Sequence, residues 1–197
     1  KSRIAAKIGH RGFGVSYSIL SIAMLTMLIW SAGKTPYVEL WPQMVWHRHV
    51  VHLGMLIVCL ILAFSIARPN PFSFGGARND RFESTRPGIV RMTRHPVLIA
   101  LALWAGLHLL PNGDVAHVLL FGVLGSFALA GRALVNRRKC REMGAEQWND
   151  LNVAVGKARL FNQPLSWIGA TVRIIAAIAG FAALFALHPV VIGVPAL

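Results

Sequence analysis

Histidine is the residue type in this chain that is best suited to bind a metal or take part in a reaction. Eight histidines are spread through a sequence that is otherwise largely apolar. An imidazole that faces hydrocarbon without a partner is costly, so histidines inside membrane segments usually line a site. His49 and His52 are three residues apart and project from nearly the same helix face, with Met55 one turn further on. His108 and His117 flank a short polar turn. Neutral imidazoles from two helices of a bundle can ligate haem iron, so these histidines are candidates for one such site.

The composition indicates an integral membrane protein. Of 197 residues, 55% are hydrophobic and 14% are charged, which is too apolar for an ordinary soluble domain. The formal net charge is +13, but the basic residues occupy three blocks, at 1–11, 68–94 and 132–159, separated by apolar runs. Such blocks are typical of loops on one side of a membrane, whereas a nucleic-acid-binding protein gathers its basic residues on one face. We therefore predict membrane lipids as partners and no nucleic acid.

Five segments have the length and apolar character expected of membrane helices, which need about 20 residues each. They are residues 14–33, 44–67, 96–110, 115–135 and 165–187, of which the third is short. We predict an all-α, polytopic transmembrane helix bundle that forms a single domain over residues 1–197, with an amphipathic surface helix at about 137–152. In the turn between the third and fourth spans, we expect Gly113 to be left-handed and Asp114 to cap the next helix.

The distribution of Lys and Arg predicts the orientation of these spans. The first, third and fifth extramembrane segments hold almost all of the basic residues, so the N-terminus of this chain is expected to be cytoplasmic and the C-terminus to lie on the far side. Arg48 is expected to snorkel to the far interface and Arg173 to the near one. His10 and His95 then lie on the cytoplasmic side, and six histidines share the far leaflet. These six are His47, His49, His52, His108, His117 and His188.

A series of short motifs runs through the second half of the chain. They are Arg94-His95-Pro96, Leu103-Trp104, His108-Leu109, Asn112-Gly113-Asp114, Leu120-Phe121-Gly122, Arg137-Arg138-Lys139, Gly144 and Trp148. In order and spacing, from residue 91 to about 151, this series resembles the NnrU family of bacterial inner-membrane proteins. The first half shows a looser resemblance, in GFGVSYSILSIAMLTMLIW and PYVELWP.

The resemblance implies a protein of the bacterial inner membrane, with a periplasmic C-terminus, that is accessory to nitrogen-oxide metabolism. The family is associated with denitrification and nitric oxide reductase genes, and it is distantly similar to the cis-zeta-carotene isomerase of plants, which uses b-type haem. This similarity implies an isomerase-like or haem-binding protein, with His108 at the position of a haem ligand and His95 at the histidine of the Arg-His-Pro element. The isomerase has a cysteine where this chain has Ala105, so a cysteine-linked ligand switch is not expected.

The second axial ligand depends on how the chain compares with its family. Members of the family usually begin with one more membrane helix, whose Pro-His-Ser element would supply the second axial histidine. With that helix, the protein would have six spans and both termini on the outer side. Without it, His52 is our candidate for the second ligand of the iron, together with His108.

The Arg94-His95-Pro96 element supports an alternative, because it is also similar to membrane methyltransferases that use S-adenosylmethionine. In those enzymes the Arg and His lie near the cofactor carboxylate, which a guanidinium both binds and orients. The similarity makes Arg91, Arg94 and His95 alternative cofactor-binding residues. A proline after His95 also suits a helix start, so helix entry alone can explain the element. A third hypothesis is a non-enzymatic membrane subunit of a larger complex.

Overall fold

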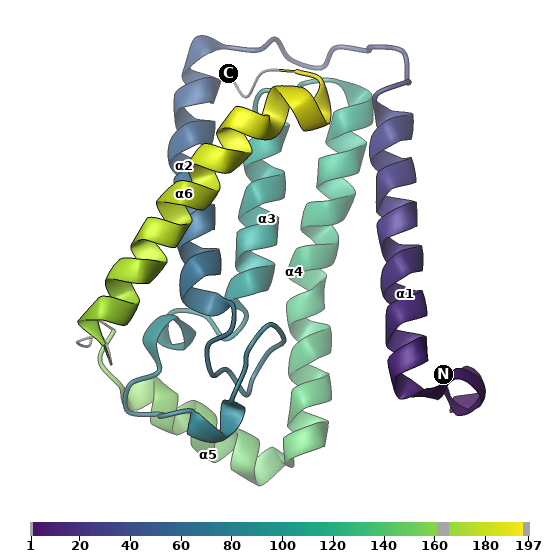
Figure 1. The fold of residues 1–197 in the computed structure, drawn as a ribbon. Coiled ribbons are helices and arrows are strands. Elements are labelled where there is room, and N and C mark those ends of the chain that lie inside the picture. Colours follow the sequence, from purple (N-terminus) through teal and green to yellow (C-terminus); the bar gives the residue numbers. More distant parts are fainter. Residues whose placement is uncertain (1, 161–165, 195–197) are drawn as a thin grey trace.

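The computed structural model describes residues 2–160 and 166–194, and within these ranges the chain is helical and forms no β-strand. The predicted all-α fold is therefore confirmed. Helices α1, α2, α3 and α4 run side by side, α6 packs obliquely across α2, and α5 lies across one end of the bundle (Figure 1). The helices are α1 (Ser2–Ala32), α2 (Val45–Ser65), α3 (Pro96–Leu109), α4 (Val115–Met143), α5 (Ala145–Lys157) and α6 (Trp167–Ile192), with short turns η1 (Asn79–Arg81) and η2 (Gly88–Arg91) before α3.

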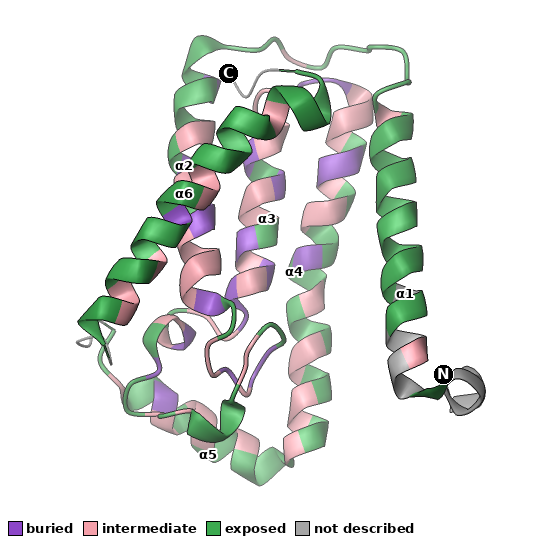
Figure 2. Cartoon of the chain, viewed as in Figure 1, coloured by how far each residue is buried: buried purple, intermediate pink, exposed green. Residues whose placement is uncertain are grey.

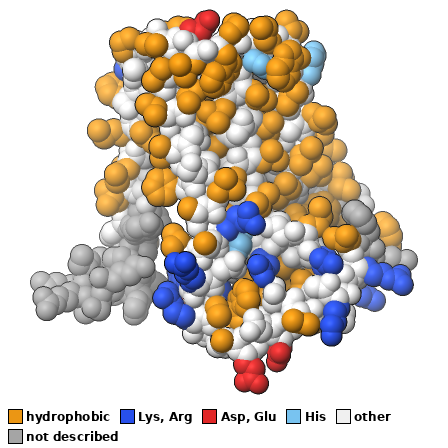
Figure 3. Space-filling model, turned by 180° about the vertical axis from the view of Figure 1, so that it is seen from behind, with side chains coloured by type: hydrophobic (Ala, Val, Ile, Leu, Met, Phe, Trp, Pro, Cys, Tyr) orange, Lys and Arg blue, Asp and Glu red, His pale blue; other side chains and the backbone are white. Residues whose placement is uncertain are grey.

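The exterior of the bundle is apolar. Helices α2, α4 and α6 are long and apolar enough to cross a membrane, and two shorter apolar helical segments accompany them, Ser18–Ala32 and Pro96–Leu109. Buried residues gather in α2, α3 and α4, whereas α1 and α6 are mostly exposed (Figure 2). On the face that Figure 3 shows, hydrophobic side chains are spread over the part away from α5, and Lys and Arg gather at the end that carries α5. Lipid is the solvent that such an exterior requires, which supports a membrane protein.

Helix α3 lies at the centre, between α2 and α4, and is only 14 residues long, or roughly 21 Å at 1.5 Å per residue. On one side, Leu107 packs so closely on Gly54 that a Cβ added to this glycine would lie 2.4 Å from a methyl carbon of Leu107. On the other side, Ala105 packs with Leu120 and Phe121 of α4. Small residues allow helices in membranes to approach closely, so these contacts fix α3 within the bundle.

The turn between α3 and α4 confirms one part of the prediction and corrects another. Asp114 caps α4, because its carboxylate accepts a hydrogen bond of 3.2 Å from the backbone N–H of His117. Gly113 is not left-handed. It is instead the point of closest approach to the loop before α2, since an added Cβ would lie 2.1 Å from the carbonyl oxygen of Trp41. The Gly113 carbonyl accepts hydrogen bonds from the N–H groups of Leu40 and Trp41, at 2.7 and 3.1 Å.

The surface helix predicted at 137–152 is wrong in its boundaries. Residues 137–143 continue α4, and the helix breaks only at Gly144, which has a φ of 92°. Nothing before this glycine interrupts the helix, and Arg138 and Glu142 form an ion pair of 2.6 Å across one turn. The surface helix is α5, which begins after the glycine. Charged residues run through both helices, so the charge pattern alone does not mark the break.

Arg173 has partners within the protein that the sequence analysis did not predict. Its guanidinium donates hydrogen bonds to the carbonyl oxygens of Ala63 and of Ile66, the latter at 3.2 Å. The last carbonyls of a helix have no partner within the helix, so a basic side chain from a neighbour can satisfy them. Arg173 therefore caps α2 and ties α6 to it.

The segment between α2 and α3 folds against the end of the bundle. The backbone N–H of Asn70 donates to Oδ1 of Asn79 at 2.8 Å, and its side-chain Nδ2 donates to the carbonyl of Arg94 at 3.0 Å. Phe72 is fully buried beside Trp148 of α5. These contacts hold the segment that leads into α3.

Candidate functional site

A cavity of about 400 Å³ lies between α2, α3 and α6, and histidines from all three helices line it. They are His52 of α2, His108 of α3 and His188 of α6. The volume is within the range of about 300–1,000 Å³ that is usual for small-molecule sites. The structure therefore places the two predicted iron ligands, His52 and His108, on one cavity and adds a third imidazole.

His108 is held in a defined orientation. Its Nδ1 lies 2.8 Å from the carbonyl oxygen of Trp104, and its ring contacts the rings of Trp104 and Phe121, with centroid separations of 4.9 and 5.2 Å. Nδ2 of Asn112 donates to the backbone carbonyl of His108 at 2.7 Å. Because a carbonyl oxygen only accepts hydrogen bonds, Nδ1 carries the proton and Nε2 of the neutral ring keeps its lone pair.

The other two imidazoles of the cavity come from α2 and α6. The ring of His52 meets the ring of Phe185 edge-on, at a centroid separation of 5.3 Å. Nδ1 of His188 lies 2.7 Å from the carbonyl oxygen of Val194, which also lines the cavity. Because the carbonyl oxygen only accepts, a neutral His188 ring carries its proton on Nδ1, as the ring of His108 does.

The rest of the lining combines one strong positive charge, the amide side chains of Gln43 and Asn112, and apolar walls. Arg48, which was expected to snorkel to the interface, lines the cavity four residues before His52. Its guanidinium can pair with a carboxylate of a bound group. The walls are aliphatic, thioether and aromatic side chains, namely Val51, Met55, Phe181, Leu184 and Phe185.

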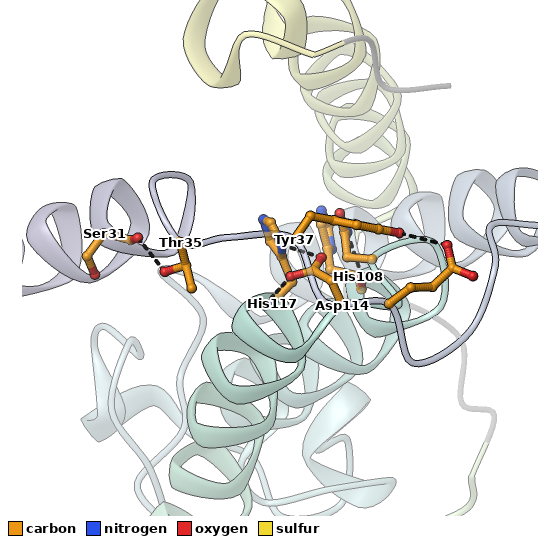
Figure 4. A network of polar contacts seen from close by, with 8 residues as sticks. Ser31, Thr35, Tyr37, His108, Asp114 and His117 are labelled. Carbon is orange, nitrogen blue, oxygen red and sulfur yellow. Dashed lines mark hydrogen bonds and ion pairs between the residues drawn. The ribbon is translucent and has the colours of Figure 1, made fainter.

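The remaining histidines near this end of the bundle have local structural roles or are exposed. Nδ1 of His47 accepts a hydrogen bond of 3.2 Å from the backbone N–H of Met44, at the start of α2. His49 is exposed. Nδ1 of His117 lies 2.6 Å from the Asp114 carboxylate, which also caps α4 (Figure 4). None of these three lines the cavity.

His95 lies at the other end of α3, which separates it from His108 by roughly 20 Å of helix. Its side chain is buried, with Nε2 at 2.8 Å from Oδ1 of Asn136 and Nδ1 at 3.0 Å from the hydroxyl of Ser73. The amide oxygen only accepts, so Nε2 carries the proton and Nδ1 accepts from the serine hydroxyl. Burial lowers the pKa of His95, and this effect outweighs the hydrogen bond with Asn136, which raises the pKa.

The two arginines of the Arg-His-Pro region also contact the protein itself. Arg94 donates to Oδ1 of Asn152 at 2.5 Å and lies over the ring of Trp148, with 5.1 Å from its guanidinium carbon to the ring centroid. Nε of Arg91 donates to the carbonyl of Ala158 at 2.9 Å. Together with His95, these side chains connect the N-terminal end of α3 to α4 and α5 through hydrogen bonds.

A bare metal ion has no evident site in the part of the chain that the structure describes. Within residues 2–160 and 166–194, no group of three or more His, Cys, Asp or Glu side chains is arranged to hold one. A haem differs, because the porphyrin supplies four ligands and the protein needs to supply only one or two. The number of histidines on the cavity would therefore be sufficient for a haem.

Comparison with known proteins identifies the family. The family model described as NnrU protein matches residues 1–196. The chain belongs to the NnrU family. The match extends the resemblance seen at residues 91–151 to essentially the whole chain, and no curated protein and no solved structure matches it. Membership of NnrU agrees with the apolar helices in indicating a membrane protein.

Two lining residues of this NnrU cavity were missed by sequence reasoning. Arg48 precedes His52 by four residues, so helical spacing already placed both side chains on one face, and this signal was available. His188 was expected in the same leaflet as His52 and His108, but depth alone does not show which helices pack together, and only the fold brings α6 to α2 and α3.

Proposed function

We propose that this member of the NnrU family binds a b-type haem in the cavity between α2, α3 and α6, with His108 as one ligand of the iron and His52 as the second. The observation that carries this proposal is that both histidines line the same cavity although they come from different helices. The Nδ1 contact of His108 with the Trp104 carbonyl supports it, because metal-ligating histidines usually bond their other ring nitrogen in this way.

The donor set and the walls of the cavity fit this group. A b-type haem needs imidazole ligands, apolar surfaces beside the porphyrin and positive charge for its propionates. The imidazoles of His52 and His108 meet the first need, and Phe181 and Phe185 contribute to the second. Arg48 would pair with a propionate.

When bound, a haem supplies an iron centre for electron transfer or for binding a small ligand such as nitric oxide. The Trp104 carbonyl orients the imidazole of His108. We infer from the association of the family with denitrification that the protein is an accessory factor of nitrogen-oxide metabolism. If the protein is an enzyme, the same haem site would carry an isomerase-like activity.

We also propose that five helices cross the bacterial inner membrane, α1 and α3 being the two additional spans. Helix α3 is shorter than the hydrocarbon core, but it lies between longer helices and is flanked by polar turns. The gathering of Lys and Arg at the α5 end supports a cytoplasmic position for that end and a periplasmic position for the C-terminus.

The S-adenosylmethionine alternative gains less support from the geometry. The groups that would bind the cofactor carboxylate are Arg91, Arg94 and His95, and each has hydrogen-bond partners within the protein. Buried polar groups that are already paired are costly to redirect to a ligand. A role as a subunit of a larger membrane complex is compatible with the haem proposal and adds no residue to the site.

Absorption spectroscopy tests the haem proposal. The full chain, purified in detergent after haem supplementation, is expected to show a Soret band that His108→Ala weakens strongly. His49→Ala is the matched control, because His49 is an exposed histidine on α2 outside the cavity, and it should leave the band unchanged. His52→Ala is expected to convert a low-spin spectrum to a high-spin one. A folded but colourless wild-type protein would refute haem binding, and an unchanged His108→Ala spectrum would refute the ligand assignment.

A further inference from the structure

A second cavity, of about 60 Å³, lies at the end of α2 opposite to the histidine cavity. Three arginines from separate turns line it, namely Arg68, Arg81 and Arg86. Phe64 of α2 and Pro96 at the start of α3 contribute apolar walls. Three arginines thus lie around one small cavity beside the ends of two helices.

The protein balances this charge only in part. Glu83 is the carboxylate among the lining residues, and in the described ranges no carboxylate lies within ion-pair distance of Arg68, Arg81 or Arg86. Arg173, which caps α2, adds a like charge that interacts with Arg68. Three arginines outnumber the single lining carboxylate. Cationic groups in excess of their counterions repel one another, and an anion bound among them reduces this repulsion.

The location indicates which kind of anion fits. Helices α2 and α6 are joined beside the cavity by Arg173, and both are apolar enough to cross a membrane, so their ends lie at the level of the lipid headgroups. Ile66 and Val172 are 51% and 58% exposed, which continues the apolar surface next to the arginines. A phospholipid would place its acyl chains along this surface and its phosphate among the guanidinium groups, whereas a free phosphate ion would gain only the second contact.

We propose that this arginine cavity binds the phosphodiester headgroup of an anionic phospholipid. The planar fork of arginine matches a pair of phosphate oxygens, and the small cavity suits a group of phosphate size. Basic pockets between membrane helices on the cytoplasmic side are suited to acidic lipid headgroups. The site is separate from the histidine cavity and does not depend on haem.

Native mass spectrometry of the full chain, with phosphatidylglycerol and phosphatidylcholine of identical acyl chains, tests the proposal. The wild-type protein is expected to retain phosphatidylglycerol preferentially. The double variant Arg81→Gln/Arg86→Gln should lose roughly 30-fold in this preference, at about five-fold for each arginine near an anionic lipid. Both side chains are exposed, so the substitutions should leave the fold intact.

The matched control is Arg137→Gln/Arg141→Gln, which removes the same charge from exposed positions of α4 outside the cavity. Its preference should stay within about two-fold of wild type, because distant surface charges are screened by salt. Equal losses in the two double variants would overturn the site and indicate a diffuse surface effect. Displacement of the lipid by millimolar inorganic phosphate would overturn the lipid as occupant and assign the cavity to a free anion.

Discussion

Nδ1 of His108 lies 2.8 Å from the carbonyl oxygen of Trp104, one helical turn earlier in α3. This contact fixes the proton on Nδ1 and leaves the Nε2 lone pair as the group that a metal or a hydrogen-bond donor can use. His188 makes an equivalent contact with the carbonyl of Val194, at 2.7 Å. Backbone carbonyls therefore fix the same tautomer in two of the three imidazoles that line the cavity.

Arg48→Gln is expected to weaken haem binding without abolishing the Soret band, because Arg48 contributes charge to the cavity and is not an iron ligand. Its guanidinium is exposed, so the dissociation constant should rise by roughly five-fold, as for a solvent-screened ion pair. Spectrophotometric titration with haem measures this change. Arg137→Gln, at the other end of the bundle, should have no effect. Equal weakening by both substitutions would show that net charge, and not Arg48, is responsible.

The stability of the protein is expected to fall below pH 6.5 through His95. Burial holds the pKa of His95 below the ordinary value of 6.5 in the folded protein. Below that value the unfolded chain binds a proton at this residue that the folded chain does not, so the stability from neutral His95 is lost as the pH falls. Thermal unfolding in detergent at about pH 7.5 and about pH 5.5 should show a steeper loss for wild type than for His95→Gln. An equal loss of thermal stability in the wild type and in His95→Gln would show that His95 is not the cause of the pH dependence.

Gly113→Ala is expected to destabilise the protein by about 1–3 kcal/mol, because the added methyl group meets a backbone oxygen and overpacks the turn. The carbonyl oxygen of Trp41 would lie 2.1 Å from the new Cβ, so one of the two segments must move. Gly106→Ala is the matched control, since nothing lies within 4 Å of its added Cβ. In a helix this control should be neutral or stabilising by up to about 1 kcal/mol. Thermal unfolding midpoints compare the two variants, and equal midpoints would refute the close-approach role of Gly113.

The sequence predicts those parts of the fold that depend on local chemistry. The apolar runs predict helices because a backbone inside lipid must satisfy its hydrogen bonds internally, and α2 and α6 end within a few residues of the expected spans. Asp114 is recognisable as a cap because its side chain bonds a backbone N–H only three residues away. His108 was predicted as a ligand from the family resemblance and its expected depth, and His52 as the second ligand for a chain without the additional helix; the fold places both on one cavity.

The features that sequence reasoning missed depend on contacts between distant segments. Gly113 is a glycine because Trp41 approaches it, and its own turn does not require a left-handed residue. Arg173 satisfies the carbonyl of Ile66, a partner that its position in α6 does not reveal. His188 reaches the cavity only because α6 packs on α2. Such relationships follow from packing and leave no periodic signal in the sequence.

The central helix, α3, has a histidine at or near each of its ends. Ser73 and Asn136 hold His95 at the entry of α3, and His108 lies near the exit. An α-helix resists compression along its axis, so the contacts of His95 with Ser73 and Asn136 help to set the position of His108 relative to the other helices. The geometry of the cavity is thus governed in part by two side chains that never touch it.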